Sequence, residues 1–168
     1  MNSEITVRKA NIKDIDTVLE IFKNVIDGMV EKGIFQWDTL YPDEKILNED
    51  IENSQMFLGE IDGKIASVFI LNEECDEEYE NGNWNYKECA FAVIHRFCVN
   101  VNFQNMGIGP KTMNIIEDMV KNNGIETIRL DTFSLNPYSL KMYEKLGYVN
   151  VGEVNWRKGL FYLFEKKL

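Results

Sequence analysis

Histidine, cysteine and proline are scarce in this chain, which has one His, three Cys and three Pro among 168 residues. The cysteines, Cys75, Cys89 and Cys98, are odd in number and include no close C-x-x-C pair. This pattern predicts neither a disulfide framework nor a zinc site. His95 and Cys98 also have opposite parity on one predicted strand, which argues against a shared metal and against a Cys-His nucleophile. We therefore expect no metal and interpret the cysteines as small buried residues.

Linkers rich in Pro, Gly or Ser are absent, as are internal repeats. A chain of this length without linkers predicts a single domain over residues 1–168. Apolar residues make up 45% and charged residues 27% of the sequence. That composition is typical of a soluble globular protein and excludes an intrinsically disordered chain.

Basic residues are outnumbered, with 18 Lys and Arg against 28 Asp and Glu, and the formal net charge is −10. So negative a surface repels a phosphate backbone and suits a cationic small molecule, so we expect no nucleic-acid partner. No apolar run approaches the length of about 18 residues that a membrane helix needs. The N-terminus, residues 1–4, has neither a basic region nor an apolar stretch. We therefore expect no signal peptide, no membrane contact and a cytoplasmic location.

Hydrophobic periodicity predicts alternating strands and helices. Asn11, with Asp14 three residues later, is typical of a helix start, Gly33 of a helix end, and Asp62-Gly63 of a hairpin turn. The predicted strands are 5–10, 56–61, 65–71, 89–99, 125–133, 148–154 and 159–164, and the predicted helices are 12–32, 43–53, 110–122 and 137–146. The polar, acidic stretch 72–86 is interpreted as a long surface loop. This order predicts an α/β fold, a mixed sheet with helices on both faces.

The most informative segment is 99–112, where a buried strand runs through Gln104–Gly109 into a helix that we expect to open at Pro110. Two glycines at such a junction allow a tight turn that aims several N–H groups at one point, next to the positive end of the helix dipole. This arrangement suits a phosphate. A Walker loop is excluded because Pro110 precedes Lys111-Thr112, and a dinucleotide fingerprint is excluded because Thr112 stands where a third glycine is needed.

The Gln-x-x-Gly-x-Gly pattern after a strand resembles the GNAT superfamily of acyl-CoA-dependent N-acetyltransferases, small bacterial members in particular. Ile5–Ala10 with Asp14 resembles the opening strand and helix of that family, His95–Gly109 its central strand and pyrophosphate loop, and Asn136–Tyr148 its C-terminal Asn…Tyr…Gly-Tyr segment. The resemblance covers nearly the whole chain. It implies a mostly antiparallel mixed sheet, acetyl-CoA as cosubstrate and a homodimer as a common state.

The resemblance also implies a cofactor site. The backbone amides of the loop would hold the pyrophosphate, Gln104 would shape the loop, and Lys111 would compensate for the N–H that Pro110 lacks. The backbone N–H near Val99 or Asn100 would face the thioester carbonyl. The residues so implied are Val99, Gln104, Asn105, Met106, Gly107, Ile108, Gly109, Lys111 and Asn136.

Tyr143 and His95 are the implied catalytic residues. Tyr143 shares a helix face with Asn136, and a phenol with a pKa of about 10 can protonate a thiolate whose thiol has a pKa of about 8.5. Its alternative role is packing at the edge of the core. His95, the one histidine, has the parity of Phe97 and Val99 and titrates in the range that a base for an alkylammonium needs. The alternatives are a structural histidine and a water chain to a carboxylate.

The acceptor site is the least specified. In similar bacterial acetyltransferases the stretch 33–42 borders the acceptor pocket, so Trp37 and Tyr41 are predicted to contact substrate, with packing over the core as the alternative. The acidic run between Glu73 and Glu80 would favour a cationic amine if it borders the cleft, and is otherwise a solvated loop.

Together these residues predict acetyl transfer from acetyl-CoA to a primary amine by direct attack through a tetrahedral intermediate, without a metal or an acyl-enzyme. The alternative is a catalytically silent acyl-CoA-binding or sensing module. The intact loop and Tyr143 favour the enzyme. The acceptor remains open among polyamines, antibiotics, amino acids and protein amines.

Overall fold

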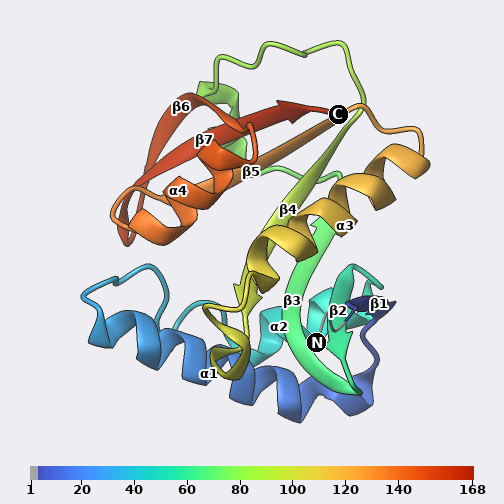
Figure 1. Ribbon diagram of the computed structural model, residues 1–168. Helices are drawn as coiled ribbons and strands as arrows, with labels where there is room; N and C mark the ends of the chain where they lie inside the picture. Colours follow the sequence, from blue (N-terminus) through green and yellow to red (C-terminus); the bar gives the residue numbers. More distant parts are fainter. Residues whose placement is uncertain (1–3) are drawn as a thin grey trace. The chain divides into compact units, whose positions relative to one another are not determined.

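The computed structural model describes residues 4–168, where seven strands are hydrogen-bonded in the order β1-β2-β3-β4-β5-β7-β6 (Figure 1). The expectation that there is no signal peptide rests on residues 1–4, of which Met1–Ser3 lie outside the described residues. The strands are β1 (Thr6–Lys9), β2 (Met56–Ile61), β3 (Lys64–Asn72), β4 (Phe91–Val99), β5 (Thr127–Phe133), β6 (Val149–Trp156) and β7 (Gly159–Lys167). The helices are α1 (Ile15–Glu31), α2 (Glu44–Glu52), α3 (Ile108–Asn122) and α4 (Pro137–Lys145), with short 3-10 helices η1 (Ile12–Asp14), η2 (Glu77–Asn81) and η3 (Val101–Phe103).

The predicted fold class is confirmed. Strand β4 pairs with β5 in parallel, whereas β1–β2, β2–β3, β5–β7 and β6–β7 are antiparallel pairs. The sheet is therefore mixed and mostly antiparallel. Each predicted helix and strand is present in the predicted order, with ends that differ by a few residues.

The chain divides into two compact units, each built from two chain segments. The first unit comprises the chain up to Leu71 together with Arg96–Thr112, and the second comprises Asn72–His95 with Met113–Leu168. Strand β4 and helix α3 contribute to both units. The single domain over residues 1–168 stays a prediction.

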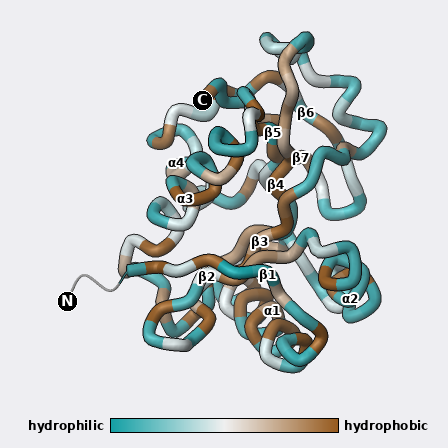
Figure 2. Tube along the Cα trace, turned by 90° about the vertical axis from the view of Figure 1, so that its right-hand side faces the viewer, coloured by the Kyte–Doolittle hydropathy of each residue, from teal (hydrophilic) through white to brown (hydrophobic). Residues whose placement is uncertain are grey.

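Helices α1 and α2 cover one face of β3 in the first unit. Apolar residues of α1 and α2 pack with Val68 and Ile70 of β3. Figure 2 shows these two helices on the same side of β3. Ser67 points to the opposite face, because side chains alternate along a strand. There its hydroxyl bonds the hydroxyl of Thr112, in the first turns of α3, at 2.9 Å. The β2–β3 turn is the predicted one, with left-handed φ angles of 50° at Asp62 and 75° at Gly63, as a tight hairpin turn requires.

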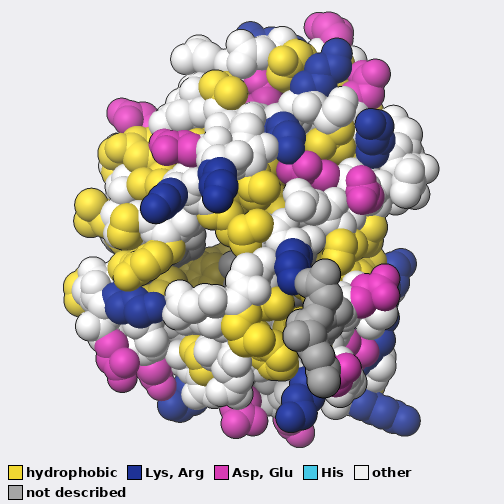
Figure 3. All heavy atoms as spheres, in the orientation of Figure 1, with side chains coloured by type: hydrophobic (Ala, Val, Ile, Leu, Met, Phe, Trp, Pro, Cys, Tyr) yellow, Lys and Arg dark blue, Asp and Glu magenta, His cyan; other side chains and the backbone are white. Residues whose placement is uncertain are grey.

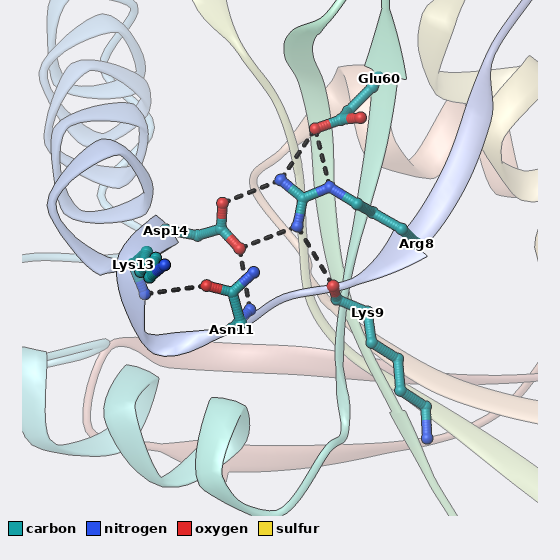
Figure 4. Close-up of polar contacts among 6 residues, drawn as sticks. All are labelled: Arg8, Lys9, Asn11, Lys13, Asp14 and Glu60. Carbon is teal, nitrogen blue, oxygen red and sulfur yellow. Dashed lines mark hydrogen bonds and ion pairs between the residues drawn. The ribbon is translucent and has the colours of Figure 1, made fainter.

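A network of short-range polar contacts fixes the start of the first helical segment (Figure 4). Asn11 accepts the Lys13 N–H at 3.0 Å, which confirms the predicted cap. Asp14 accepts the Asn11 N–H at 2.8 Å, so the two residues form a capping box. Arg8 of β1 donates to both Asp14 oxygens at 2.8 and 2.9 Å and to Glu60 of β2 at 2.9 Å. These contacts tie the helix start to the first two strands.

The structure of segment 72–86 differs from the predicted long surface loop. It contains η2, and within it Tyr79 and Trp84 are buried. The Tyr79 hydroxyl donates to Asp131 of β5 at 2.7 Å. Asp131 lies on the sheet face opposite to that of Leu130, whose partner Phe164 packs against Tyr143 of α4. These two buried aromatics were missed in the sequence analysis because the residues around them are mostly acidic or polar.

Charged side chains of both signs are interspersed on the face drawn in Figure 3, although the chain as a whole carries a net charge of −10. Along the described chain, residues 4–168, we find no helix with the length and hydrophobicity that spanning a bilayer requires.

The Arg8 hydrogen bonds lower the pKa of Asp14 below its ordinary value. A carboxyl with a lowered folded-state pKa contributes stability above its unfolded pKa of about 3.9, and this contribution is lost as the pH falls below it. Asp14→Ala removes the box and the ion pair, so we expect the free energy of unfolding at pH 7 to fall by about 1 kcal/mol.

The matched control is Asp16→Ala, because Asp16 is an exposed acidic residue in the first turn of α1. Urea titrations at pH 7 and pH 3 compare the two. We expect the loss in Asp14→Ala to shrink at pH 3 and the loss in Asp16→Ala to be smaller at pH 7. Equal losses at pH 7 would contradict a role for the Arg8 network.

Candidate active site

The loop between β4 and α3 turns through two left-handed residues. Asn105 has a φ of 61° and Gly107 a φ of 72°, values that suit asparagine and glycine. The Gln104 side chain donates from Nε2 to the Val99 carbonyl at 3.2 Å. The loop is thereby closed onto the end of β4, from which it departs.

Helix α3 begins at Ile108, two residues before the predicted start at Pro110. Proline is tolerated there because first-turn amides have no acceptor within the helix. The Lys111 N–H already bonds the Gly107 carbonyl at 3.3 Å. The first-turn N–H groups that can face an anion are therefore those of Ile108 and Gly109, and Pro110 contributes none.

The space in front of the loop suits a phosphate group. A Cβ built on Gly107 meets no heavy atom within 4 Å, so glycine is needed here for its φ angle and not because the position is crowded. Lys111 is exposed in the first turn of α3, and Met106 is 59% exposed on the loop. Open space, helix-terminal amides and a nearby lysine together fit the pyrophosphate of a coenzyme A thioester.

Strand β4 contains a left-handed residue, Arg96, that the sequence did not indicate, and we refer to this point of the strand as the bulge. The β4–β5 register runs from Phe91↔Thr127 to Ile94↔Leu130, while β4 continues to Val99. Between them Arg96 has a φ of 46°, a left-handed value that costs a long side chain of order 1 kcal/mol or more. Side-chain alternation is interrupted at Arg96, so the parity that we assigned to His95 does not extend past it.

The amide of Val99 points away from β3. The Asn100 N–H donates to the Ala66 carbonyl of β3 at 2.9 Å, and successive N–H groups of a strand point to opposite sides. Of the two amides considered for the thioester carbonyl, Asn100 is thus engaged with β3, and Val99 is the candidate donor.

A buried ion pair holds the bulge. Arg96 donates to both carboxylate oxygens of Asp50 on α2, at 2.9 and 2.6 Å, and from Nη1 to the Tyr41 hydroxyl at 2.9 Å. The two side chains of the pair are 13% and 8% exposed. Displacement of either side chain would leave the other charge buried and unpaired, so the pair resists movement of Arg96 out of its left-handed conformation.

Trp37 and Tyr41 occupy different environments. Trp37 is 8% exposed and packs against Phe22 of α1, with ring centroids 5.6 Å apart. Tyr41 is 36% exposed and lies against Arg96. Trp37 therefore has the packing role that we gave as the alternative, while substrate contact by either residue stays a prediction.

Helix α4 positions Asn136 and Tyr143 in the second unit. Asn136 is the N-cap of α4 and its side chain accepts the Ser139 N–H at 3.2 Å. The Tyr143 ring packs at 5.7 Å from Tyr148 and 6.2 Å from Phe164. Burial, and secondarily the charge of Asp131, raise the pKa of Tyr143 above its ordinary value. The hydroxyl therefore carries its proton at every physiological pH.

His95 is half-buried and contacts the end of β3. Its Nε2 lies 2.8 Å from the Asn72 Oδ1 and 3.1 Å from the Glu74 carbonyl oxygen. These polar contacts are the kind expected of a structural histidine, which is one of the alternative predictions. The role of His95 as a base stays a prediction.

The thiol of Cys98 is unsuited to nucleophilic chemistry, because burial raises its pKa to about 12. The interpretation of the cysteines as small buried residues holds for Cys98 and is wrong for Cys75, which is exposed, while Cys89 is half-buried. Partial desolvation raises the pKa of the Cys75 thiol as well. Within residues 4–168, no three His, Cys, Asp or Glu side chains are grouped so that they could hold a metal ion.

The predicted residues other than Trp37 form four groups. In the first unit, the loop residues from Gln104 to Lys111 gather with Val99 at the end of β4, and Tyr41 joins Arg96. In the second unit, Asn136 and Tyr143 share α4, whereas His95 contacts Asn72 and Glu74.

Sequence reasoning missed Asp50, Arg96 and Asn72. Asp50 lies next to Ile51 on the buried side of α2, and an acidic residue on an apolar helix stripe is a signal that can be read from the pattern. Asn72 interrupts an apolar strand at its end, which is a weaker signal. No signal identified Arg96, because left-handed backbone is rare outside Gly, Asn and Asp.

Comparisons with known proteins identify the family to which this fold belongs. Residues 22–148 match the acetyltransferase (GNAT) family. The chain belongs to this family, whose members are N-acetyltransferases that use acetyl-CoA.

Three solved structures illustrate the likeness in fold. A GNAT family acetyltransferase from Streptococcus agalactiae is 20% identical, with a TM-score of 0.85 and 99% of each chain covered. One from Listeria monocytogenes is 22% identical, with a TM-score of 0.81, covering 100% of this chain and 99% of the other. The protein yncA of Salmonella typhimurium, solved with its cofactor acetyl-CoA, is 16% identical, with a TM-score of 0.69 and 99% and 95% covered.

The Arg96–Asp50 pair should dominate the stability of the bulge. We expect Asp50→Ala to lower the free energy of unfolding by about 3 kcal/mol, because it leaves a buried guanidinium without its carboxylate. The control is Glu49→Ala on the same helix, which removes only the exposed Lys45–Glu49 pair at 4.0 Å and should cost about 0.5 kcal/mol or less. Denaturant melts measure both, and a loss in Asp50→Ala no larger than in the control would show that the pair does not hold the bulge.

Proposed function

We propose that this protein transfers the acetyl group of acetyl-CoA to a primary amine by direct attack of the amine on the thioester. The observation that carries the proposal is the loop of Gln104–Gly109, which has two left-handed residues and leads into the first turn of α3; backbone amides in such an arrangement suit a pyrophosphate. Acetyl-CoA supplies the acetyl group as an activated thioester. The chain's own residues bind this cosubstrate, stabilise developing charge and move protons.

Binding would use the backbone more than side chains. The amides of Asn105, Met106, Gly107, Ile108 and Gly109 face the pyrophosphate, and Lys111 adds a positive charge. Gln104 holds the loop on Val99. The Val99 N–H then donates to the thioester oxygen as negative charge develops there, a kind of contribution worth a few kcal/mol in enzymes.

Proton transfer would use Tyr143 and His95. The Tyr143 hydroxyl, protonated at all physiological pH values, donates its proton to the departing thiolate. His95 takes a proton from the acceptor ammonium, so that the neutral amine attacks. Asn136, as the N-cap of α4, orders the helix that carries Tyr143.

The acceptor would be a cationic primary amine. This part of the proposal rests on the net charge of −10 and on the acidic residues around η2, which raise the local concentration of cations. Trp37 and Tyr41 stay candidates for acceptor contact. A cytoplasmic location and a homodimer stay predictions.

Gly107→Asp tests the pyrophosphate site. We expect the affinity for acetyl-CoA to fall at least about a hundredfold, or about 2.7 kcal/mol, because a carboxylate then faces the phosphates at a left-handed position. The control is Gly124→Asp, because Gly124 also has a left-handed φ, 77°, and open space around it, beyond the end of α3. The two variants share the backbone strain and the added charge.

Isothermal titration calorimetry compares the acetyl-CoA affinity of both variants with that of the parent. We expect both to lose similar stability and only Gly107→Asp to lose affinity. Parent affinity in folded Gly107→Asp would remove the loop from the cofactor site.

Tyr143→Phe tests the general acid. The ring contacts with Tyr148 and Phe164 are kept and only the hydroxyl is lost, so we expect kcat to fall about a hundredfold or more with little change in acetyl-CoA affinity. Tyr148→Phe removes a hydroxyl from the same aromatic cluster and should leave kcat within about threefold of the parent.

Steady-state rates on an amine panel, with thermal melts, distinguish the outcomes. A smaller rate loss is expected with a thioester whose leaving group needs less protonation. Equal kcat in Tyr143→Phe and parent would assign protonation of the thiolate to solvent. Acetyl-CoA binding without turnover of any amine in the parent would instead indicate a binding module.

A further inference from the structure

The side chain of Asn72 occupies the point where β3 ends and the chain turns toward η2. Its Oδ1 accepts the Glu74 N–H at 2.9 Å, a turn in which an asparagine side chain stands in for a backbone carbonyl. This bond also fixes which way the amide faces. If Oδ1 and Nδ2 were exchanged, the amide NH₂ would face the Glu74 N–H, and two donors would meet.

The oriented amide determines the hydrogen on His95. The His95 Nε2 lies 2.8 Å from the same Asn72 Oδ1 and 3.1 Å from the Glu74 carbonyl oxygen. Both partners are oxygen acceptors, so Nε2 must be the donor. In a neutral imidazole a hydrogen on Nε2 leaves the lone pair on Nδ1.

We propose that Asn72 is a positioning residue, which holds the neutral His95 in the tautomer with hydrogen on Nε2 and so makes Nδ1 the basic nitrogen. This inference rests on the proposed function in one respect, the role of His95 as the base for the acceptor. The tautomer itself follows from hydrogen bonds within the second unit alone.

The proton balance is simple in this arrangement. The acceptor ammonium gives one proton to Nδ1 and becomes a neutral amine, while His95 becomes an imidazolium that later returns the proton to solvent. The Nε2–H stays bonded to Asn72 and Glu74 in both protonation states, because the imidazolium is a donor at both nitrogens. The ring therefore has no need to turn during the cycle.

The chain provides a direct readout, because it contains one histidine. Nitrogen-15 NMR of the imidazole in histidine-labelled protein, in its neutral form, yields one pair of ring signals that distinguishes the two tautomers. We expect the parent to show the Nε2–H tautomer. A parent spectrum of the Nδ1–H tautomer would overturn the proposal without any variant.

Three variants test the part played by Asn72. Asn72→Leu removes the acceptor, so we expect a mixture of tautomers and a loss in kcat of roughly tenfold with unchanged KM for acetyl-CoA. Asn72→Asp keeps an acceptor oxygen for both Glu74 and His95, so we expect the parent tautomer to persist. The matched control is Asn150→Leu, because the Asn150 Oδ1 likewise accepts the N–H two residues ahead, that of Gly152, at 3.0 Å, and we expect parent spectra and rates.

The outcomes separate this proposal from the proposed function. Parent-like imidazole signals in Asn72→Leu would overturn it, since the Glu74 carbonyl would then suffice. If Asn72→Leu fails to fold, the Nδ1–H tautomer in Asn72→Asp would overturn it equally. His95→Gln tests the base separately: parent kcat there would exclude His95 as the base and leave the tautomer assignment standing, whereas a loss of about a hundredfold supports both.

Discussion

Strand β4 leaves its pairing with β5 before its own end, and the candidate cofactor site follows from that constraint. Register is kept from Phe91 to Ile94, and the left-handed Arg96 then interrupts the strand. Beyond the bulge the Asn100 N–H stays on β3, so the Val99 amide is directed away from β3. The loop that follows is closed onto the Val99 carbonyl by Gln104. A short stretch of backbone thus carries both a candidate oxyanion donor and the amides for a pyrophosphate.

The left-handed backbone at Arg96 is accompanied by an ion pair with Asp50, and breaking this pair would cost considerable free energy. Its guanidinium is buried with Asp50 on α2, and loss of one partner would leave the other charge in a poor environment. The Arg8 network differs, because Arg8 is 39% exposed and its bonds join neighbouring segments at a helix start. The Arg8 network determines where the first helix begins. The Arg96–Asp50 pair holds a backbone conformation that the local sequence does not favour.

Backbone and side chains divide the chemistry between them. Amides suit the invariant parts of the cosubstrate, because a phosphate and a thioester oxygen need donors and not proton transfer. Proton movement needs titratable groups, and two candidates are held by their surroundings: burial raises the pKa of Tyr143, and the Nε2 of His95 lies within hydrogen-bond distance of two oxygen atoms.

Local chemistry alone determined the order of helices and strands, the Asn11 cap, the Asp62-Gly63 turn and the glycine-bearing loop before α3. Each depends on residues within a few positions of one another, and periodicity and turn propensity act over that range. The start of α3 two residues earlier than predicted, and the burial of Tyr79, could be seen only in the packed structure. The same holds for the contacts of Arg96 with Asp50, of His95 with Asn72 and of Tyr79 with Asp131, whose partners are 46, 23 and 52 residues apart. Such pairs form only when the sheet brings distant segments together. No local sequence pattern specifies which donor will bond to which acceptor.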